Sequence, residues 1–174
     1  MIDSAYYKWF SREFTNALAL TWCSATNDVI LAAYGISPER TQSARLNSAG
    51  DLRMLIGRVG NGALIIEFSS SPADETLTAL AQHGPCLSVQ WSDFVPPLVS
   101  YRAKNGLVVS FDPLDWDWDP IPDYASVEQW VAATPADRET WDDNWGLATL
   151  ITAEALCQAA IDDEWVQSTH IGIS

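Results

Sequence analysis

The sequence predicts an α+β domain in which helices pack on a mainly antiparallel sheet of about five or six strands. Two dipeptides, Asn61-Gly62 and Asn105-Gly106, each lie between apolar runs, which is a strong signal for a β-hairpin. Helical spacings and caps alternate with these strands without a regular βαβ order. The 174 residues are 48% hydrophobic, enough for one core. We therefore expect residues 1–174 to form a single α+β domain, with a sheet-forming portion (1–112) and an acidic, tryptophan-rich helical portion (113–174).

The chain is expected to open with a helix, a strand and a second helix. Apolar side chains recur with helical spacing at Tyr6, Phe10, Phe14 and Ala17. A strand should follow at 18–23. The short helix after it can be capped by Thr26 or Asn27, and Gly35 supplies a residue that tolerates the left-handed conformation in which helices often end. Residues 36–50 are expected to be loop.

Two hairpins are expected to form most of the sheet. The first joins 52–59 to 63–68, and its strands are apolar on both faces, as in central strands that are covered on both sides. The second joins 99–103 to 107–111, where apolar and polar residues alternate, so one of its faces should contact water. Both turns are predicted to be two-residue type I′ turns, because Asn and Gly accept positive φ.

The clearest predicted helix lies between the hairpins. Ser71 is expected as its N-cap, Pro72 as its first residue and Gly84-Pro85 as its stop. Its buried stripe would consist of Thr76, Leu77, Leu80 and Ala81. A strand at 86–91 should then join the sheet.

The helical portion is expected to contain three helices. Ser126 and Gln129 have the spacing of a capping box, and Thr134-Pro135 is expected to start a second, short helix. Apolar spacing predicts a last helix over 147–163. The tail at 169–172 is expected to fray.

The charge of the chain is unevenly distributed. The net charge is −14, and residues 106–174 hold 14 acidic residues and one basic residue, Arg138, while residues 1–105 hold nine acidic and eight basic residues. Such a surplus of acids argues against a nucleic-acid ligand, because phosphates repel it. Six of the nine tryptophans lie in the same acidic portion: Trp116, Trp118, Trp130, Trp141, Trp145 and Trp165. A tail that only solubilises has few aromatic residues, so this portion should be folded or should fold on binding.

Composition also bears on the compartment. The chain has neither the apolar stretch of a membrane span nor the N-terminal pattern of a secretory signal, so we expect no membrane partner and a cytoplasmic protein. Cys23, Cys86 and Cys157 are widely spaced and form no CxxC or Cys/His ligand pattern. They are expected to be reduced and mostly buried thiols.

No motif predicts a cofactor or a metal site. Asp115, Asp117 and Asp119 resemble the first ligands of a calcium loop, but Pro120 stands where that loop needs glycine and Ser126 where it needs a bidentate glutamate. The glycines at 57–62 belong to a hairpin and not to a dinucleotide-binding turn. The sequence His83-Gly84-Pro85-Cys86 is explained by a helix stop followed by a strand.

Several stretches of the chain resemble the bacterial, mainly actinobacterial, domain-of-unknown-function family 6461. The resemblance covers roughly residues 6–115 and is carried by the aromatic opening with Ala17-Leu18-Ala19-Leu20-Thr21-Trp22, by Asn27-Asp28-Val29-Ile30 with Tyr34-Gly35, by Ile56-Gly57-Arg58-Val59-Gly60-Asn61-Gly62-Ala63, and by Leu107-Val108-Val109-Ser110-Phe111-Asp112-Pro113. The Trp-Asp stretch after Leu114 departs from the less aromatic segment expected in that family. The resemblance implies a fold and no reaction.

Acidic residues combined with tryptophan favour a protein-binding role. Tryptophan is enriched in interface hot spots, and a surface of one charge sign steers partners of the opposite sign. We expect a non-enzymatic protein that masks a basic surface of a protein partner, as immunity proteins and anti-defence inhibitors do. The expected partner-binding residues are Asp115, Trp116, Asp117, Trp118, Asp119, Asp142, Asp143 and Trp145.

Other interpretations of the acidic portion stay open at the level of sequence. The same Trp and Asp side chains could form a cleft for a small molecule or a carbohydrate, because indole faces stack on sugar rings. The protein could also be a structural subunit of a larger assembly. An acidic surface that only confers solubility, in a protein with an unrelated function, is a further alternative.

Overall fold

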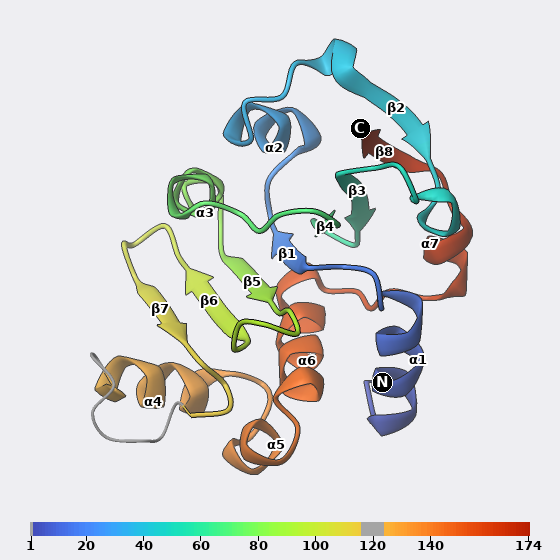
Figure 1. Cartoon of the computed structure of the whole chain (residues 1–174). Helices are drawn as coiled ribbons and strands as arrows, with labels where there is room; N and C mark the ends of the chain where they lie inside the picture. The colour runs from blue at the N-terminus through green and yellow to red at the C-terminus, as the bar shows by residue number, and fades with distance from the viewer. Residues whose placement is uncertain (1, 116–123) are drawn as a thin grey trace.

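The structure, a computed structural model, describes residues 2–115 and 124–174, and the strands within them form one eight-stranded sheet (Figure 1). The strand order is β2-β8-β3-β4-β1-β5-β6-β7, and all neighbouring strands are antiparallel. The strands are β1 (Ala19–Cys23), β2 (Thr41–Ala44), β3 (Met54–Val59), β4 (Gly62–Glu67), β5 (Cys86–Gln90), β6 (Leu98–Arg102), β7 (Val108–Phe111) and β8 (His170–Ile173). The α+β class and the antiparallel sheet are confirmed, whereas the expected number of five or six strands was wrong.

The two strands that the sequence did not predict are β2 and β8. Strand β2 lies in the segment expected to be loop, and β8 is the tail expected to fray. Thr41 of β2 pairs with Ile173 of β8, and the other edge of β8 pairs with β3. Strand β8 therefore lies inside the sheet and not at its edge. Both strands have four residues, and each depends on a partner more than 100 residues away, so no local pattern marks them.

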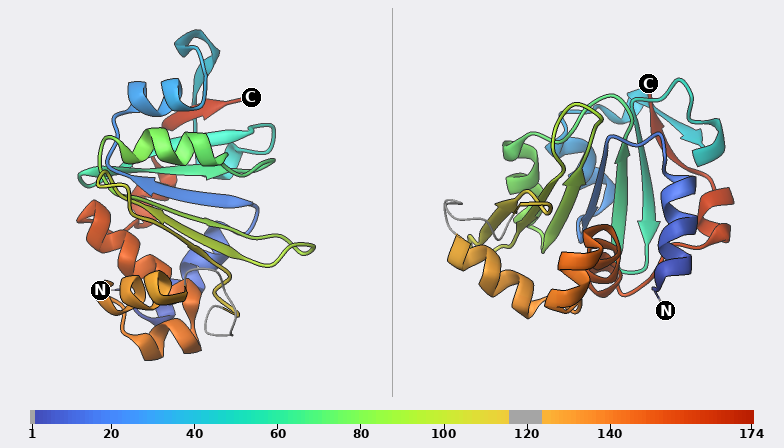
Figure 2. Two further views of the ribbon diagram at one scale, coloured as in Figure 1. Left: turned by 90° about the vertical axis from the view of Figure 1, so that its left-hand side faces the viewer. Right: turned by 60° about the horizontal axis from the view of Figure 1, so that its bottom comes forward.

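Helices cover both faces of the sheet (Figure 2). The helices are α1 (Ser4–Glu13), α2 (Asn27–Ala33), α3 (Asp74–Ala81), α4 (Tyr124–Ala133), α5 (Arg138–Asp143), α6 (Trp145–Cys157) and α7 (Asp163–Gln167), with short 3-10 turns η1 (Pro38–Arg40) and η2 (Leu46–Ser48). We call the side covered by α2 and α3 the α3 face. The opposite side, where α1, α4, α5, α6 and α7 pack, is the α6 face.

Alternation along the central strand β1 separates the two cores. Leu20 and Trp22 pack in the cluster on the α6 face, while Cys23 packs with α2 and α3 on the opposite face. All five residues of β1 are buried, as expected for a strand covered on both sides. The prediction of a strand at 18–23 is therefore confirmed, to within one residue.

Both hairpins exist, but their turns differ from the prediction. Val59 pairs with Gly62, so the turn of the first hairpin is Gly60-Asn61 and not Asn61-Gly62. Gly60 has φ +51°, whereas Gly62 belongs to β4 and has no positive φ. In the second hairpin the Ala103 N–H donates to the Leu107 carbonyl and Gly106 has φ +87°, which is a three-residue loop with a glycine bulge.

Several helix boundaries also differ from the predicted ones. Helix α3 begins at Asp74 with Ala73 in the cap position, and α4 begins at Tyr124, so Ser126 lies inside the helix. Helix α5 begins after Asp137, whose carboxylate accepts the Thr140 N–H. At α5 the side chain of Asp137 takes the capping role, whereas Ala73 at the start of α3 makes no side-chain capping hydrogen bond.

The last predicted helix, over 147–163, is shorter than expected: α6 begins at Trp145 and ends at Cys157, and a separate helix, α7, begins at Asp163. The C-cap of α6 is Gln158, which has the left-handed φ of 57°. The Asn61 N–H of the β3–β4 turn donates to the Cys157 carbonyl at 2.9 Å, and the Asn61 side chain donates to the Gln158 side chain. A turn from the first half of the chain therefore satisfies the end of α6.

Candidate functional site

An apolar cleft of about 410 Å³ opens on the α6 face and is lined by residues of α1, α6, β1, β5 and the segment after β5. Its walls carry six aromatic side chains: Tyr7, Phe10, Phe14, Trp22, Trp91 and Trp145. The volume falls within the range of about 300–1,000 Å³ that is common for ligand pockets. The lining also includes the hydroxyl-bearing residues Tyr7, Ser11, Thr15 and Thr149.

Helix α1 forms one wall of the cleft and is held at its N-terminal end. Its N-cap is Asp3, whose carboxylate accepts the N–H groups of Ala5 and Tyr6 at 3.0 and 2.9 Å. The Tyr6 hydroxyl donates to the Ile161 carbonyl at 2.8 Å and accepts the Ile161 N–H at 3.1 Å. Burial raises the pKa of Tyr6 to about 12, so this hydroxyl keeps its proton at physiological pH.

Ring stacking and one glycine shape the interior. Phe10 stacks on Phe14 with ring centroids 4.1 Å apart and lies 6.4 Å from Trp22. Gly146, the second residue of α6, faces Tyr7 so closely that a Cβ there would lie 2.6 Å from Tyr7 Cε2. The absence of a side chain at this position lets the Tyr7 ring form part of the wall.

The segments that bear the lining residues Trp91, Pro97 and Leu114, which we call the mouth of the cleft, carry exposed apolar side chains. Trp91 and Pro97 line it, and the loop between them carries Phe94, which is 95% exposed, and Val95, which is 62% exposed. The Ser92 hydroxyl accepts the N–H groups of Phe94 and Val95 at 3.2 and 3.1 Å, which defines the shape of this loop. Leu114, another lining residue, is 65% exposed.

The structure places one predicted partner-binding residue in the lining of this cleft and two others next to lining residues in the sequence. Trp145 lines it, Asp115 is exposed next to the lining residue Leu114, and Asp143 is exposed two residues before Trp145. Asp142 is also exposed but contacts Arg138. The predicted residues Trp116, Asp117, Trp118 and Asp119 lie outside the described residues.

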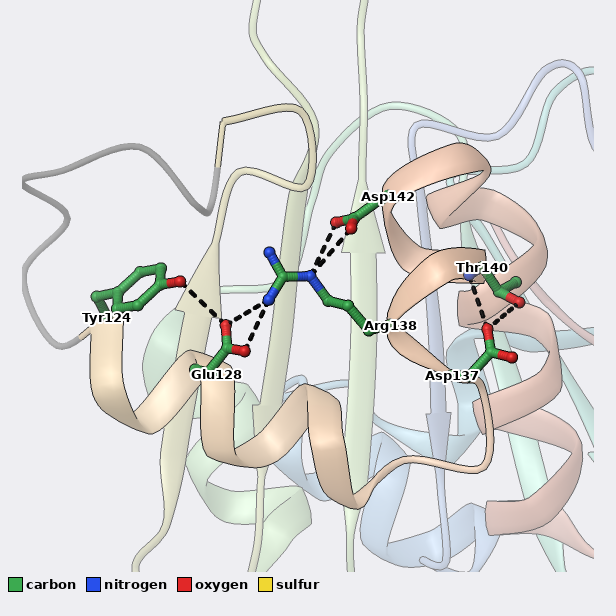
Figure 3. A network of polar contacts seen from close by, with 6 residues as sticks. All are labelled: Tyr124, Glu128, Asp137, Arg138, Thr140 and Asp142. Carbon is green, nitrogen blue, oxygen red and sulfur yellow. Dashed lines mark hydrogen bonds and ion pairs between the residues drawn. The ribbon is translucent and has the colours of Figure 1, made fainter.

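Arg138, the one basic residue of the acidic portion, joins α4 to α5 (Figure 3). Its Nη1 donates to both carboxylate oxygens of Glu128 at 2.7 and 2.8 Å, and its Nε donates to Asp142 at 3.0 and 3.1 Å. The Tyr124 hydroxyl donates to Glu128 at 3.1 Å. Two carboxylates therefore offset the positive charge of Arg138, and Asp142 has a structural role that the sequence did not predict.

The aromatic residues of the cleft outside α6 were not predicted as site residues. Phe10 and Phe14 were assigned to the buried stripe of a helix, which they also form. Trp91 follows a strand and precedes a loop with an exposed aromatic residue, and this juxtaposition was the signal that could have found it. Nothing in the sequence states that α1 and the β5–β6 loop meet.

Within residues 2–115 and 124–174, no group of three or more His, Cys, Asp or Glu side chains could hold a metal ion. His170 stacks on Trp165, with ring centroids 4.1 Å apart, and its Nε2 lies 2.8 Å from the Trp165 carbonyl oxygen. In the same part of the chain, no helix combines the length and apolar character needed to span a bilayer.

The three cysteines are free and buried, as predicted. Although they are distant in sequence, the fold places Cys23 directly opposite Cys86 across β1 and β5. Burial raises the pKa of all three thiols, that of Cys157 to about 12. These thiols are therefore protonated and poor nucleophiles at neutral pH.

Comparison with known proteins found no matching family model, no matching curated protein and no matching solved structure. The resemblance to the bacterial family 6461 therefore stays a prediction that depends on the residues quoted for it.

Proposed function

We propose that this protein is a non-enzymatic binding protein that masks a basic surface of a protein partner in a stoichiometric complex. The supporting observation is the charge of the chain after residue 105, where the sequence contains 14 acidic residues and a single basic residue. Because Glu128 and Asp142 already pair with Arg138, little positive charge offsets the remaining carboxylates. Inhibitors of the immunity or anti-defence type act on such basic partners.

The position of these carboxylates suits electrostatic steering better than catalysis. Asp115, Asp143 and Asp163 are exposed and belong to three different parts of the fold: the segment after β7, helix α5 and helix α7. Charges spread over a surface raise the rate at which a partner of opposite sign arrives. A hydrolase would instead need a particular pair of carboxyl groups held across a cleft.

A second candidate function is the binding of a small apolar molecule, and the aromatic cleft of about 410 Å³ favours it. The described lining of this cleft contains no carboxylate, so the support is for an apolar ligand. A carbohydrate site that combines tryptophan with aspartate receives less support from the same lining.

The proposed function can be tested through its salt dependence. The protein is immobilised, proteins captured from a bacterial lysate are identified by mass spectrometry, and each purified partner is titrated at increasing ionic strength. We expect partners rich in Lys and Arg whose affinity falls steeply with salt, because mobile ions screen exposed charges. Neutral or acidic partners, or affinities that do not respond to salt, would contradict the proposal.

Charge variants make this test specific. Replacing Asp115 and Asp143 together by Asn should slow association and reduce the salt dependence. The matched control replaces Asp28 and Asp51, two exposed carboxylates of the sheet-forming portion, and should leave both properties almost unchanged. Equal effects of the two pairs would mean that net charge alone, and not this region, governs binding.

A further inference from the structure

The geometry points to the aromatic cleft as the anchor site for a bulky apolar side chain of a partner segment that also carries Lys or Arg. This inference rests on the proposed function and specifies the chemistry of the partner. It commits to one occupant, a basic segment with an aliphatic or aromatic anchor. Three features of the molecule support it: the lining of the cleft, its mouth and the charges around that mouth.

The lining favours an apolar side chain over a polar one. Six aromatic rings surround the cleft, and the Thr149 hydroxyl already donates to the Trp145 carbonyl at 2.8 Å. Ser11 and Thr15 are exposed at the α1 wall, so water can satisfy their hydroxyls. A ligand therefore gains free energy here mainly by removing apolar surface from water.

The mouth favours a macromolecular segment over a free small molecule. Phe94, Val95 and Leu114 are exposed large apolar residues on segments that also line the cleft. A small molecule inside the cleft would leave them in water, whereas a protein segment that crosses the mouth would cover them as well. Exposed apolar residues around an apolar cleft are typical of protein interaction sites.

The charges near the mouth favour a basic partner. Asp93, Asp115 and Asp143 are exposed, and each lies within two residues of a lining residue. Helix α1 carries two exposed cations, Lys8 and Arg12, and Arg12 pairs with Glu13 at 3.0 Å. A second copy of the chain, with its net charge of −14, would bring like charges together, so self-association through this face is disfavoured.

The test uses three synthetic peptides of equal length, titrated by calorimetry at low ionic strength. One combines Lys and Arg with a central Leu and Trp, the second keeps the charges but replaces the apolar pair by Ser, and the third keeps the apolar pair in a neutral background. We expect the first peptide to bind roughly tenfold or more tightly than either of the others. Its binding should also show the more negative heat-capacity change, which marks buried apolar surface.

A cleft-filling variant assigns this binding to the cleft. Ser11→Phe places a ring into the cleft from an exposed position of α1, and Ser4→Phe adds the same ring to an exposed position of that helix away from the cleft. Ser11→Phe should lower the affinity for the first peptide by roughly tenfold and leave the affinity for the second unchanged. Ser4→Phe should change neither affinity. Thermal melting of both variants shows whether the fold is retained.

A second pair of variants keeps the test decisive even if Ser11→Phe unfolds. Val95→Ala at the mouth should weaken the first peptide several-fold, while Val108→Ala, an exposed valine on β7, should not. If the first two peptides bind equally, the cleft inference is wrong although the charge-masking proposal survives. If the neutral apolar peptide binds as tightly as the first, the inference that the partner segment is basic is wrong. If none binds, the cleft inference is overturned.

Discussion

The two faces of the sheet differ in the kind of side chain that fills them. The core of the α3 face consists of aliphatic residues, cysteines and a methionine, with Tyr34 as its one partly buried aromatic ring in the described chain. The α6 face instead contains Phe10, Phe14, Trp22, Trp130 and Trp141 among its buried residues.

The two clefts with aromatic linings lie on the face with the aromatic core. The aromatic cleft lies on the α6 face, and so does a second one of about 320 Å³, lined in part by Tyr101 and Trp130. The α3 face has a buried polar cluster instead, in which Tyr34 and Ser70 donate to Glu67 at 3.0 and 2.9 Å. We infer that the α3 face mainly stabilises the fold and that the α6 face supplies the binding site.

The largest expected effect is the loss of an aromatic side chain inside the α6 face. Trp141 is fully buried, lies 5.5 Å from Trp130 between ring centroids, and donates its indole N–H to the Thr134 hydroxyl at 2.9 Å. Trp141→Ala should lower the free energy of unfolding by about 3–5 kcal/mol. Urea denaturation measures this change. Trp145→Ala, at the half-buried cleft residue, should cost clearly less, and equal costs would contradict the distinction between core and cleft.

The next effect concerns the contact between the sheet and α6. At Gly62 a Cβ would lie 2.7 Å from the Cys157 sulfur and 2.7 Å from the Cys23 carbonyl oxygen. Gly62→Val should therefore destabilise by about 1–3 kcal/mol through overpacking, and thermal melting can detect it. The expected cost of Gly62→Val thus comes from crowding and not from a positive φ at Gly62, which the predicted Asn61-Gly62 turn would have required.

A control at the second hairpin separates steric crowding from backbone strain. Gly106 has φ +87°, and a Cβ at this position would have no neighbouring atom within 4 Å, so Gly106→Ala adds backbone strain without crowding. Its expected cost is about 1 kcal/mol. A larger cost for Gly106→Ala than for Gly62→Val would show that crowding against α6 is unimportant.

The buried carboxyl of the α3 face should make stability depend on pH. Glu67 is 2% exposed, and burial raises its pKa although Ser70, Tyr34 and Arg53 act in the opposite direction. Because the folded pKa lies above the unfolded value of about 4.3, the stabilising contribution is complete below that pH and is lost as the pH rises through the folded pKa.

Glu67→Gln removes this titration. The variant should show a flatter dependence of unfolding free energy on pH above about 4 than the parent. The control Glu75→Gln, at an exposed position of α3, should follow the parent curve. Parallel curves for the parent and Glu67→Gln, measured by denaturation at several pH values, would show that this carboxyl does not couple to folding.

The smallest expected effect is on the cysteines. Since all three thiols are buried and their pKa values are raised, a thiol reagent should modify the native protein slowly at neutral pH and the unfolded protein rapidly. Reduction should change neither the mass nor the melting temperature. A disulfide between Cys23 and Cys86, detected by mass spectrometry, would overturn this expectation.

Local patterns in the sequence determined much of the sheet-forming portion. Strands near 18–23 and 86–91 and the two hairpins were predicted, because alternating apolar residues and Asn-Gly dipeptides act over short distances. A helix near the proposed capping box at Ser126 was also predicted, and α4 buries Val127, Trp130 and Val131. The uneven distribution of charge could be determined without the structure, because it is a property of composition along the chain.

Contacts between distant segments decided the rest. The four residues of β8 have too little periodicity to mark a strand, and they are ordered by pairing with β3 and β2. Helix α6 ends where the β3–β4 turn caps it. No residue near Cys157 in the sequence indicates this end. The cleft is likewise formed by α1, α6 and the end of β5, which are distant in sequence. The sequence determined which side chains could bind a partner, while tertiary packing decided which of them share one surface, because their proximity depends on long-range pairing.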